Sequence, residues 1–108
     1  MKKLLLILLC FPMIGLAQQT YIPDSNFEQA LINLGYDNVL DNYVLTSNIS
    51  NIGYLDVSSQ NISDLTGIQD FVALWYLNCH NNQLMTLDVS NNILLTGLHC
   101  AMNLLSSI

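Results

Sequence analysis

Apolar and polar residues recur at a fixed spacing along the second half of the chain. Residues 74–84 follow the pattern L-x-x-L-x-C-x-x-N-x-L at every specified position, and residues 95–105 follow it again. A looser copy over residues 52–62 precedes these two, with apolar side chains at Ile52, Leu55, Val57 and Ile62 but Gln60 in place of the Asn. Such self-similarity is the signature of a solenoid, in which each repeat buries its apolar side against its neighbours.

Within each repeat, the spacing of apolar residues predicts one short strand. Leu77 and Cys79 alternate with Asn78, which is the period of a strand with one buried face. Each repeat then carries an Asn, Asn82 or Asn103, whose amide we expect to turn inward and satisfy backbone groups that the corner leaves unpaired. The second half of each unit, such as residues 84–92, is expected to return as extended or 3₁₀ structure.

The stretch before the repeats predicts a helix that covers their first apolar face. Ser25 and Glu28 have the spacing of a capping box, in which each side chain bonds to the other residue's backbone. We therefore expect a helix over residues 24–34, ended by Gly35, with one buried side made by Phe27, Ala30, Leu31 and Leu34. Residues 36–51, rich in Asn and Asp, are expected to form a connector with one strand near residues 43–45.

The first seventeen residues have the features of a secretory signal peptide. Lys2 and Lys3 precede an apolar run, and Gly15-Leu16-Ala17 supplies the small residues that a signal peptidase needs. The alternative is a membrane anchor, which requires roughly 20 continuous apolar residues. Pro12 and the polar residues from Gln18 onward cut the run short, so we expect cleavage after Ala17 and no membrane insertion of the mature chain.

Removing this segment leaves a strongly acidic chain. Lys2 and Lys3 are the only Lys or Arg residues, so the formal charge, with His neutral, changes from −6 to −8 when they are lost. Affinity for nucleic acid depends on Lys and Arg side chains that neutralise phosphates. We therefore expect no nucleic-acid partner, and anionic membrane surfaces are disfavoured for the same reason.

These motifs resemble the leucine-rich repeat family. Residues 61–77 are similar to the 22-residue internalin-like repeat, through Ile62, Asp64, Leu65, Ile68, Phe71, Leu74 and Leu77. The later 21-residue units resemble a variant common in secreted bacterial surface proteins, with residues 82–84, residues 87–92 and Cys79 or Cys100 in the strand. Residues 21–31 are similar to the N-terminal cap of such proteins.

The resemblance implies an α/β fold: a leucine-rich repeat solenoid with parallel short strands on its concave face and an N-terminal helical cap. The corresponding domains are a signal peptide at 1–17, a cap at 18–51, and repeats at 52–108 that are truncated in the third copy. Because the repeat breaks off at Ile108 without a C-terminal cap, we expect the chain to be a fragment of a longer protein.

The outward positions around each strand are the candidate ligand-binding residues, because such proteins usually bind partners on the concave face. Two aromatic residues and a His in adjacent repeats have the chemistry to grip a peptide or stack on a sugar ring. The alternative is that Trp75 and Tyr76 only shield the first repeats near the cap. The candidates are Tyr54, Asp56, Trp75, Tyr76, Asn78, His80 and His99.

Metal and catalytic chemistry have little support in the sequence. His80 follows a Cys whereas His99 precedes one, and both should point outward while the cysteines point inward. No nucleophile is placed beside a base, and the acidic residues are scattered, which leaves calcium possible but unsupported. We expect no cofactor and no catalytic residue. Cys79 and Cys100 are expected to be buried free thiols, with a disulfide as the alternative.

The sequence thus predicts a secreted or cell-surface, non-enzymatic module that recognises a protein or glycan through the concave face of the solenoid. Two alternatives remain. The repeats could be the scaffold or targeting arm of a larger secreted enzyme, or they could form a structural or adhesive surface protein.

Overall fold

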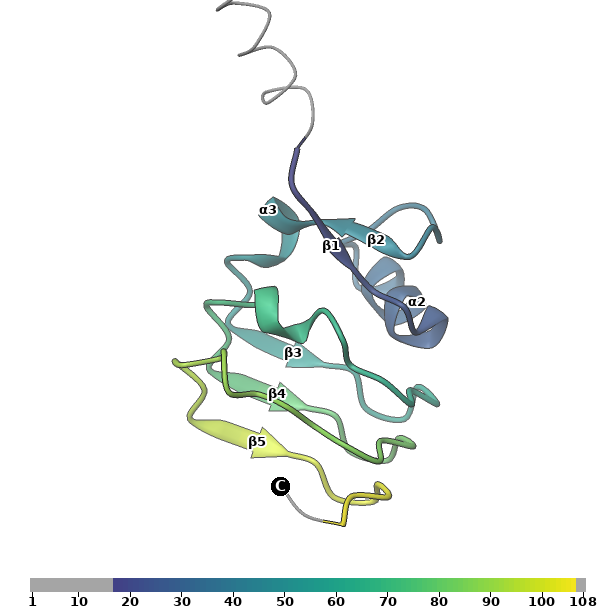
Figure 1. Ribbon diagram of the computed structural model, residues 1–108, viewed down its shortest axis with the longest axis vertical. Helices are drawn as coiled ribbons and strands as arrows, with labels where there is room; N and C mark the ends of the chain where they lie inside the picture. The colour runs from purple at the N-terminus through teal and green to yellow at the C-terminus, as the bar shows by residue number, and fades with distance from the viewer. Residues whose placement is uncertain (1–16, 107–108) are drawn as a thin grey trace, which may run out of the picture.

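The computed structural model describes residues 17–106, and its central feature is a three-stranded parallel sheet (Figure 1). The strands are β3 (Tyr54–Asp56), β4 (Tyr76–Asn78) and β5 (Gly97–His99), ordered as in the chain. Leu55, Leu77 and Leu98 stand opposite one another in the register, one from each predicted repeat. Each sequence repeat therefore contributes one strand to the sheet, and we call each such unit of the structure a rung.

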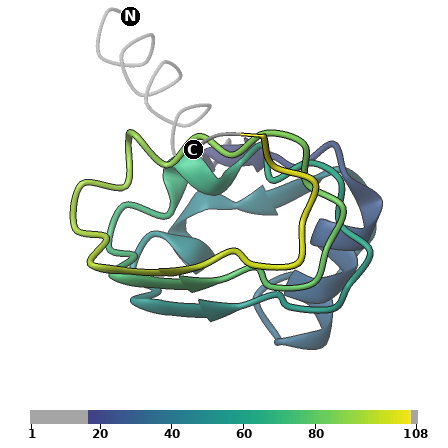
Figure 2. The ribbon, with the colours of Figure 1, turned by 90° about the horizontal axis from the view of Figure 1, so that it is seen from below.

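Each rung is one turn of a flattened coil. Seen from below, the strands lie along one side of the coil and irregular backbone runs along the other (Figure 2). This return side contains one short 3₁₀ helix, η1 (Ile68–Asp70), and otherwise turns and extended segments. The interior is filled by the repeated apolar positions, and several of these side chains are fully buried: Leu74, Leu77, Cys79 and Leu84.

Two asparagines, the buried Asn82 after β4 and the partly buried Asn103 after β5, satisfy backbone groups at the corners of the coil, as predicted. The Asn82 amide nitrogen donates to the carbonyls of Val57 and Cys79 at 2.9 and 3.0 Å, and its Oδ1 accepts from the N–H groups of Gln60 and Ile62, both at 3.0 Å. Asn103 repeats the arrangement one rung later. The side chain thus joins two rungs and pairs groups that would otherwise be buried without partners.

A second buried Asn position was missed by the sequence analysis. Asn92 donates from its amide nitrogen to the carbonyls of Ile68 and Phe71 in the preceding rung, at 2.9 and 3.1 Å. In the repeat register, Asn92 occupies the position that Phe71 holds one rung earlier. A polar bridge therefore replaces an aromatic side chain at this point of the return side.

The cap consists of two helices and an antiparallel strand pair. β1 (Gln19–Tyr21) pairs with β2 (Tyr43–Leu45), which is the strand expected in the connector, and α2 (Ser25–Asn33) is followed later by α3 (Thr46–Ile49). Phe27 and Leu31 on α2 are fully buried. The Phe27 ring stacks on Phe71 of the first repeat with centroids 6.2 Å apart, so the helix covers the first apolar face of the solenoid.

Two details of the predicted helix are wrong. The N-cap is Asp24, whose Oδ1 accepts from the N–H groups of Asn26 and Phe27, so Ser25 and Glu28 do not form a capping box. Asp24 and Ser25 are both good capping residues, and local sequence does not decide between them. Leu34 was expected on the buried side but is 47% exposed, because the helix ends before it.

The predicted signal peptide, up to Leu16, lies outside the described residues. Within residues 17–106, no helix has the length and apolar character required to cross a membrane.

Candidate ligand-binding surface

The outward side chains of the three strands and their flanking residues form a grid on the sheet face that was predicted to be concave. Each rung supplies four positions, two at or before the start of the strand and two at or after its end. In chain order these are Gly53, Tyr54, Asp56 and Ser58; Trp75, Tyr76, Asn78 and His80; and Thr96, Gly97, His99 and Ala101. All seven candidate residues lie on this grid, which has an aromatic half and a polar half.

The aromatic half is a cluster of three rings. Tyr54 stacks on Tyr76 with centroids 5.1 Å apart and an interplanar angle of 23°, and the Trp75 ring lies 6.2 Å from each of the two tyrosine rings. Tyr54 and Trp75 are 51% and 52% exposed. A cluster of exposed rings is the kind of surface feature that marks candidate interaction sites. The three rings therefore make this half of the grid the stronger candidate for contact with a ligand.

Two glycines make room for these rings. A Cβ on Gly53 would lie 2.4 Å from Nε1 of Trp75, and a Cβ on Gly97 would lie 2.5 Å from the Tyr76 ring. Each aromatic side chain therefore lies across the glycine of a neighbouring rung. The sequence analysis did not identify this role of the two glycines, because the contact is between repeats.

The polar half begins at Asp56. Its Oδ1 accepts from the backbone N–H and the hydroxyl of Ser58, at 3.0 and 2.7 Å. These hydrogen bonds lower the pKa of Asp56, and the charge of His99 lowers it further. The carboxylate is thus held in one place and stays ionised. In the next rung, Asn78 accepts from the His80 N–H at 3.1 Å in a similar turn.

The two histidines lie side by side, which the sequence analysis did not expect. Their ring centroids are 4.6 Å apart with an interplanar angle of 34°, and Nδ1 of His80 is buried without a hydrogen-bond partner. Both residues face outward as predicted, and they meet as diagonal neighbours on adjacent rungs. They extend the polar half of the grid.

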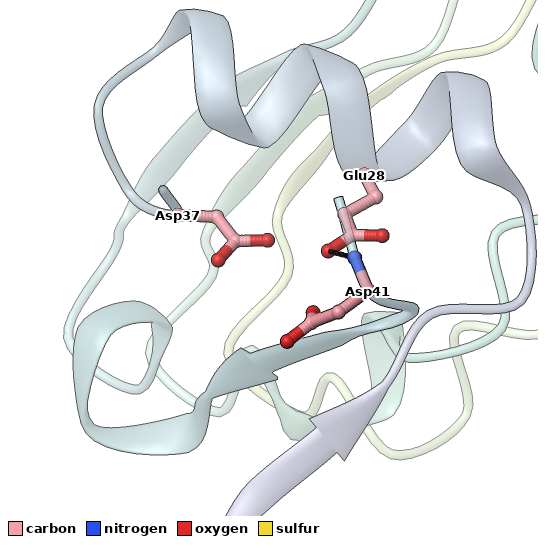
Figure 3. Close-up of side chains that lie close together, drawn as sticks. All are labelled: Glu28, Asp37 and Asp41. Carbon is pink, nitrogen blue, oxygen red and sulfur yellow. Dashed lines mark hydrogen bonds between the residues drawn. The ribbon is translucent and has the colours of Figure 1, made fainter. Parts of the chain in front are cut away.

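A cluster of three carboxylates in the cap was also missed. Glu28 on α2 meets Asp37 and Asp41 from the following loop, with one oxygen of each within 4.8 Å of the others (Figure 3). Glu28 is fully buried, and its two oxygens accept from the backbone N–H groups of Asp41 and Asn42, at 3.1 and 2.7 Å. This buried side chain therefore fixes the turn that leads into β2.

The environment of Glu28 favours its protonated form. Burial raises its pKa from 4.5 to about 7, and the nearby Asp37 carboxyl raises it as well, against the lowering effect of the two backbone N–H groups. One oxygen of Asp37 is itself buried without a hydrogen-bond partner. The cluster is a structural element that is sensitive to proton concentration.

The two cysteines are free thiols at equivalent positions of adjacent rungs. Cys79 is fully buried and Cys100 is partly exposed. Burial raises the pKa of Cys79 to about 12, and the neighbouring Cys100 adds to the effect. Cys79 acts as a small apolar side chain and not as a nucleophile.

Enclosed hollows do not offer an alternative site. Two surface hollows, of about 100 and 170 Å³, are lined by return-side residues around Asp64 and Asp88 and by cap residues around Tyr36. Pockets that enclose a small ligand are larger, on the order of 300 to 1,000 Å³. In the described part of the chain, the open concave surface is the stronger candidate.

Comparisons with known proteins place this geometry in a known fold. No family model and no curated protein matches the chain. Solved structures do match. The functional domain of InlJ from Listeria monocytogenes, described as including a cysteine ladder, is 28% identical with a TM-score of 0.72, and the match covers 85% of this chain and 21% of that one.

Two further Listeria monocytogenes internalins match at lower identity. InlF is 24% identical with a TM-score of 0.74 over 82% of this chain and 26% of its own, and internalin C2 is 22% identical with a TM-score of 0.74 over 86% and 43%. The chain therefore has the internalin-like leucine-rich repeat fold, as predicted from its repeats. It spans less than half the length of each of these internalin structures.

A further match comes from Clostridium perfringens ZmpB. That structure contains CBM51-2 in complex with GlcNAc together with INT domains, and it is 23% identical with a TM-score of 0.66, over 77% of this chain and 17% of that one. The same fold thus occurs within a longer polypeptide beside a domain of another type.

Proposed function

We propose that the chain is a secreted or cell-surface interaction module of a bacterium, which recognises a protein or glycan through its concave sheet. In this proposal residues 1–17 form a signal peptide that is removed after Ala17, residues 18–51 form the cap, and residues 52–108 form the repeats. The binding residues are those of the grid: Tyr54, Asp56, Trp75, Tyr76, Asn78, His80 and His99. The module has no catalytic activity of its own.

The exposed ring cluster of Tyr54, Trp75 and Tyr76 is the observation that carries this proposal. Trp75 and Tyr76 each lie across a glycine of a neighbouring rung, and Tyr54 stacks on Tyr76, so contacts between rungs hold the three rings in place. Aromatic side chains fixed in this way contribute large contact area at low entropic cost, which is why they are enriched at binding interfaces. A role limited to shielding the core would not require half of the Trp75 surface to remain open.

The fold supports the coarse part of the proposal. Internalin-like repeats are typical of interaction domains, and the matched structures cover most of the present chain. The InlJ domain is described as including a cysteine ladder. By analogy, we propose that Cys79 and Cys100 are two steps of a ladder of reduced thiols behind the sheet, of which Cys79 is fully buried and Cys100 partly exposed.

Arrays of extracellular proteins and of glycans provide the test. The purified chain should bind specific spots, and Trp75→Ser should abolish that binding, because it removes the largest exposed ring. Met85→Ser is the matched control, since Met85 is 69% exposed but lies on the return segment. No binding, or an equal loss in both variants, would contradict the proposal.

One specific observation favours the alternative of an arm within a larger secreted enzyme. In the ZmpB structure, INT domains accompany CBM51-2, so this fold is compatible with a modular polypeptide. The reading frame beyond codon 108 distinguishes the two: further 21-residue repeats favour a binding solenoid, and a hydrolase-like domain favours the arm. Self-association of the full-length chain without ligand would favour the structural or adhesive role.

A further inference from the structure

The charge of the chain restricts what its concave surface can bind. Residues 17–108 contain no Lys or Arg. Among the grid positions, Asp56 is the single carboxylate, and it lies in the same rung as the exposed Tyr54. A partner therefore meets ring faces and a fixed negative charge with no competing Lys or Arg from the chain itself. Such a field attracts cations and repels acidic partners.

The spacing of these groups suits a planar cation. Tyr54 and Asp56 are two residues apart on β3 and project to the same side, roughly 7 Å from each other. The Trp75 ring lies 6.2 Å from the Tyr54 ring at an angle of 55°, so the two rings are in tilted contact, and each side chain remains about half exposed. Ring faces are negative, and a cation within about 6 Å of a centroid is attracted to them.

The carboxylate is prepared before any ligand arrives. Two hydrogen bonds from Ser58 hold one oxygen of Asp56 and reduce the freedom of its side chain. A charged group that is already ordered loses little entropy when it pairs with a partner. Asp56 and the exposed ring of Tyr54, with Trp75 in contact with that ring, therefore form one preorganised surface at the edge between the aromatic and polar halves.

We propose that this surface binds an arginine side chain of a partner protein, with the guanidinium over the rings of Tyr54 and Trp75 and paired to Asp56. Arginine fits better than lysine because its planar, weakly hydrated group both stacks on rings and pairs with carboxylates. The inference deepens the proposed function and rests on it. The partner is accordingly a protein with a basic, arginine-bearing segment.

Trp75 is the only tryptophan of the chain, so its fluorescence reports directly on this site. The experiment titrates the purified chain with a short glycine peptide containing two arginines, and with the same peptide in which citrulline replaces both. Citrulline keeps the shape and removes the charge. We expect a saturable change with the arginine peptide, at least threefold weaker binding of the citrulline peptide, and a decrease in affinity with added salt.

Asp56→Asn should lower the affinity for the arginine peptide three- to tenfold. Asp88→Asn is the matched control, because Asp88 makes the same turn with Ser90, at 2.9 and 2.6 Å, on the return side. Equal binding of both peptides, equal effects of both variants, or no change in Trp75 emission would overturn the arginine inference. A neutral glycan or neutral peptide that changes Trp75 emission would also overturn it, while leaving the proposed concave-face recognition intact.

Discussion

Two buried titratable side chains, Glu28 in the cap and Cys79 in the repeats, show how burial changes acid–base behaviour in this small molecule. For both groups burial is the largest cause of a raised pKa, and for both the second cause is a neighbouring group of the same kind. Glu28 is surrounded by backbone donors and a second carboxyl. Cys79 is surrounded by apolar side chains and a second thiol. The consequences therefore differ: the first affects stability and the second affects reactivity.

Stability should fall as pH rises from 4.5 to about 7. In this range native Glu28 keeps a proton that the unfolded chain has lost, so the native state is favoured at the acidic end. The pKa values of Asp56 and Asp88 are lowered, so their opposite effect is complete below this range. We expect the midpoint of thermal unfolding to fall between pH 5 and pH 8. A midpoint independent of pH would contradict the burial of Glu28.

Asp37→Asn should flatten this dependence. The substitution removes a carboxyl that raises the pKa of Glu28 and supplies an amide that can donate to it. We expect the free energy of unfolding to increase by about 1 kcal/mol at pH 8 and to change little at pH 5. The increase at pH 8 corresponds to a somewhat less than tenfold decrease in the proton affinity of native Glu28. Denaturant titration at the two pH values measures this. Asp64→Asn, on the return side, is the control and should change neither value.

Cys79 should resist alkylation in the folded chain. Its pKa of about 12 leaves almost no thiolate at pH 8, and the side chain is fully buried. With iodoacetamide at pH 8, we expect modification of Cys100 first and of Cys79 at least a hundredfold more slowly than in denaturant. Mass spectrometry of the digested chain distinguishes the two sites. If Cys79 reacted as fast in the folded chain as in denaturant, the expected protection by burial would be wrong, and the last two rungs would have to open readily.

At the scale of the element, each rung depends on its Asn. Asn82→Ala should lower the free energy of unfolding by about 3 to 4 kcal/mol, because it leaves several buried backbone groups unpaired at about 1 to 3 kcal/mol each before relaxation. Asn103→Ala should cost about half as much, since its surroundings are only partly buried. Denaturant unfolding of both variants measures the difference. Similar losses of stability in the two variants would contradict the deeper burial of Asn82 relative to Asn103.

The contact between neighbouring rungs at Gly53 can be tested by adding one methyl group. Gly53→Ala places a Cβ against the indole of Trp75, which must move aside. We expect a changed Trp75 emission spectrum, weaker ligand binding, and a loss of stability of about 1 kcal/mol from overpacking. Ser58→Ala, in the same rung but away from the indole, is the control for the spectrum. An unchanged spectrum would mean that Trp75 does not lie across Gly53.

The sequence predicted the repeating elements and, in the cap, helix α2 and strand β2, but it missed strand β1 and the contacts between distant parts of the chain. Leu77, Cys79 and Asn82 could be assigned because the same pattern returns in the next repeat with the same environment. β1 is a very short strand, and helix α2 separates it in the chain from β2, its antiparallel partner. No local periodicity therefore predicts it. Neither does local spacing predict the contacts of Glu28, whose partners follow 13 and 14 residues later.

The candidate site was predicted as a set of positions but not as a geometry. Tyr54, Trp75 and Tyr76 were placed on one face by the repeat register, and the structure brings their rings together. The contact between His80 and His99 was not predicted, because it joins different positions of successive repeats along a diagonal. Diagonal contacts depend on the stagger between rungs, which a one-dimensional pattern does not contain.

At the scale of the whole molecule, burial falls from the cap toward the last rung. Leu74, Leu77, Cys79 and Leu84 are fully buried, whereas the equivalent Leu95, Leu98, Cys100 and Leu105 are only partly buried. In a solenoid each rung is covered by the next, so stability is a sum of rungs and of interfaces between them. The partly buried apolar side chains of the last described rung could therefore be covered further by a neighbouring unit.

Extending the array by one unit should raise stability sharply. A copy of residues 85–105 joined after Leu105 continues the register and would cover the partly buried side chains of the present last rung. Each newly covered Leu contributes roughly 1 to 2 kcal/mol, so we expect a gain of several kcal/mol and a higher unfolding midpoint. In the extended chain Asn103→Ala should become as costly as Asn82→Ala, because its surroundings become fully buried. Denaturant unfolding at several protein concentrations measures both effects and also tests whether the unextended chain covers this side by self-association. If the extended chain were no more stable than the original, the interface between neighbouring rungs would contribute nothing to stability. That result would contradict the view that each rung is stabilised by the next.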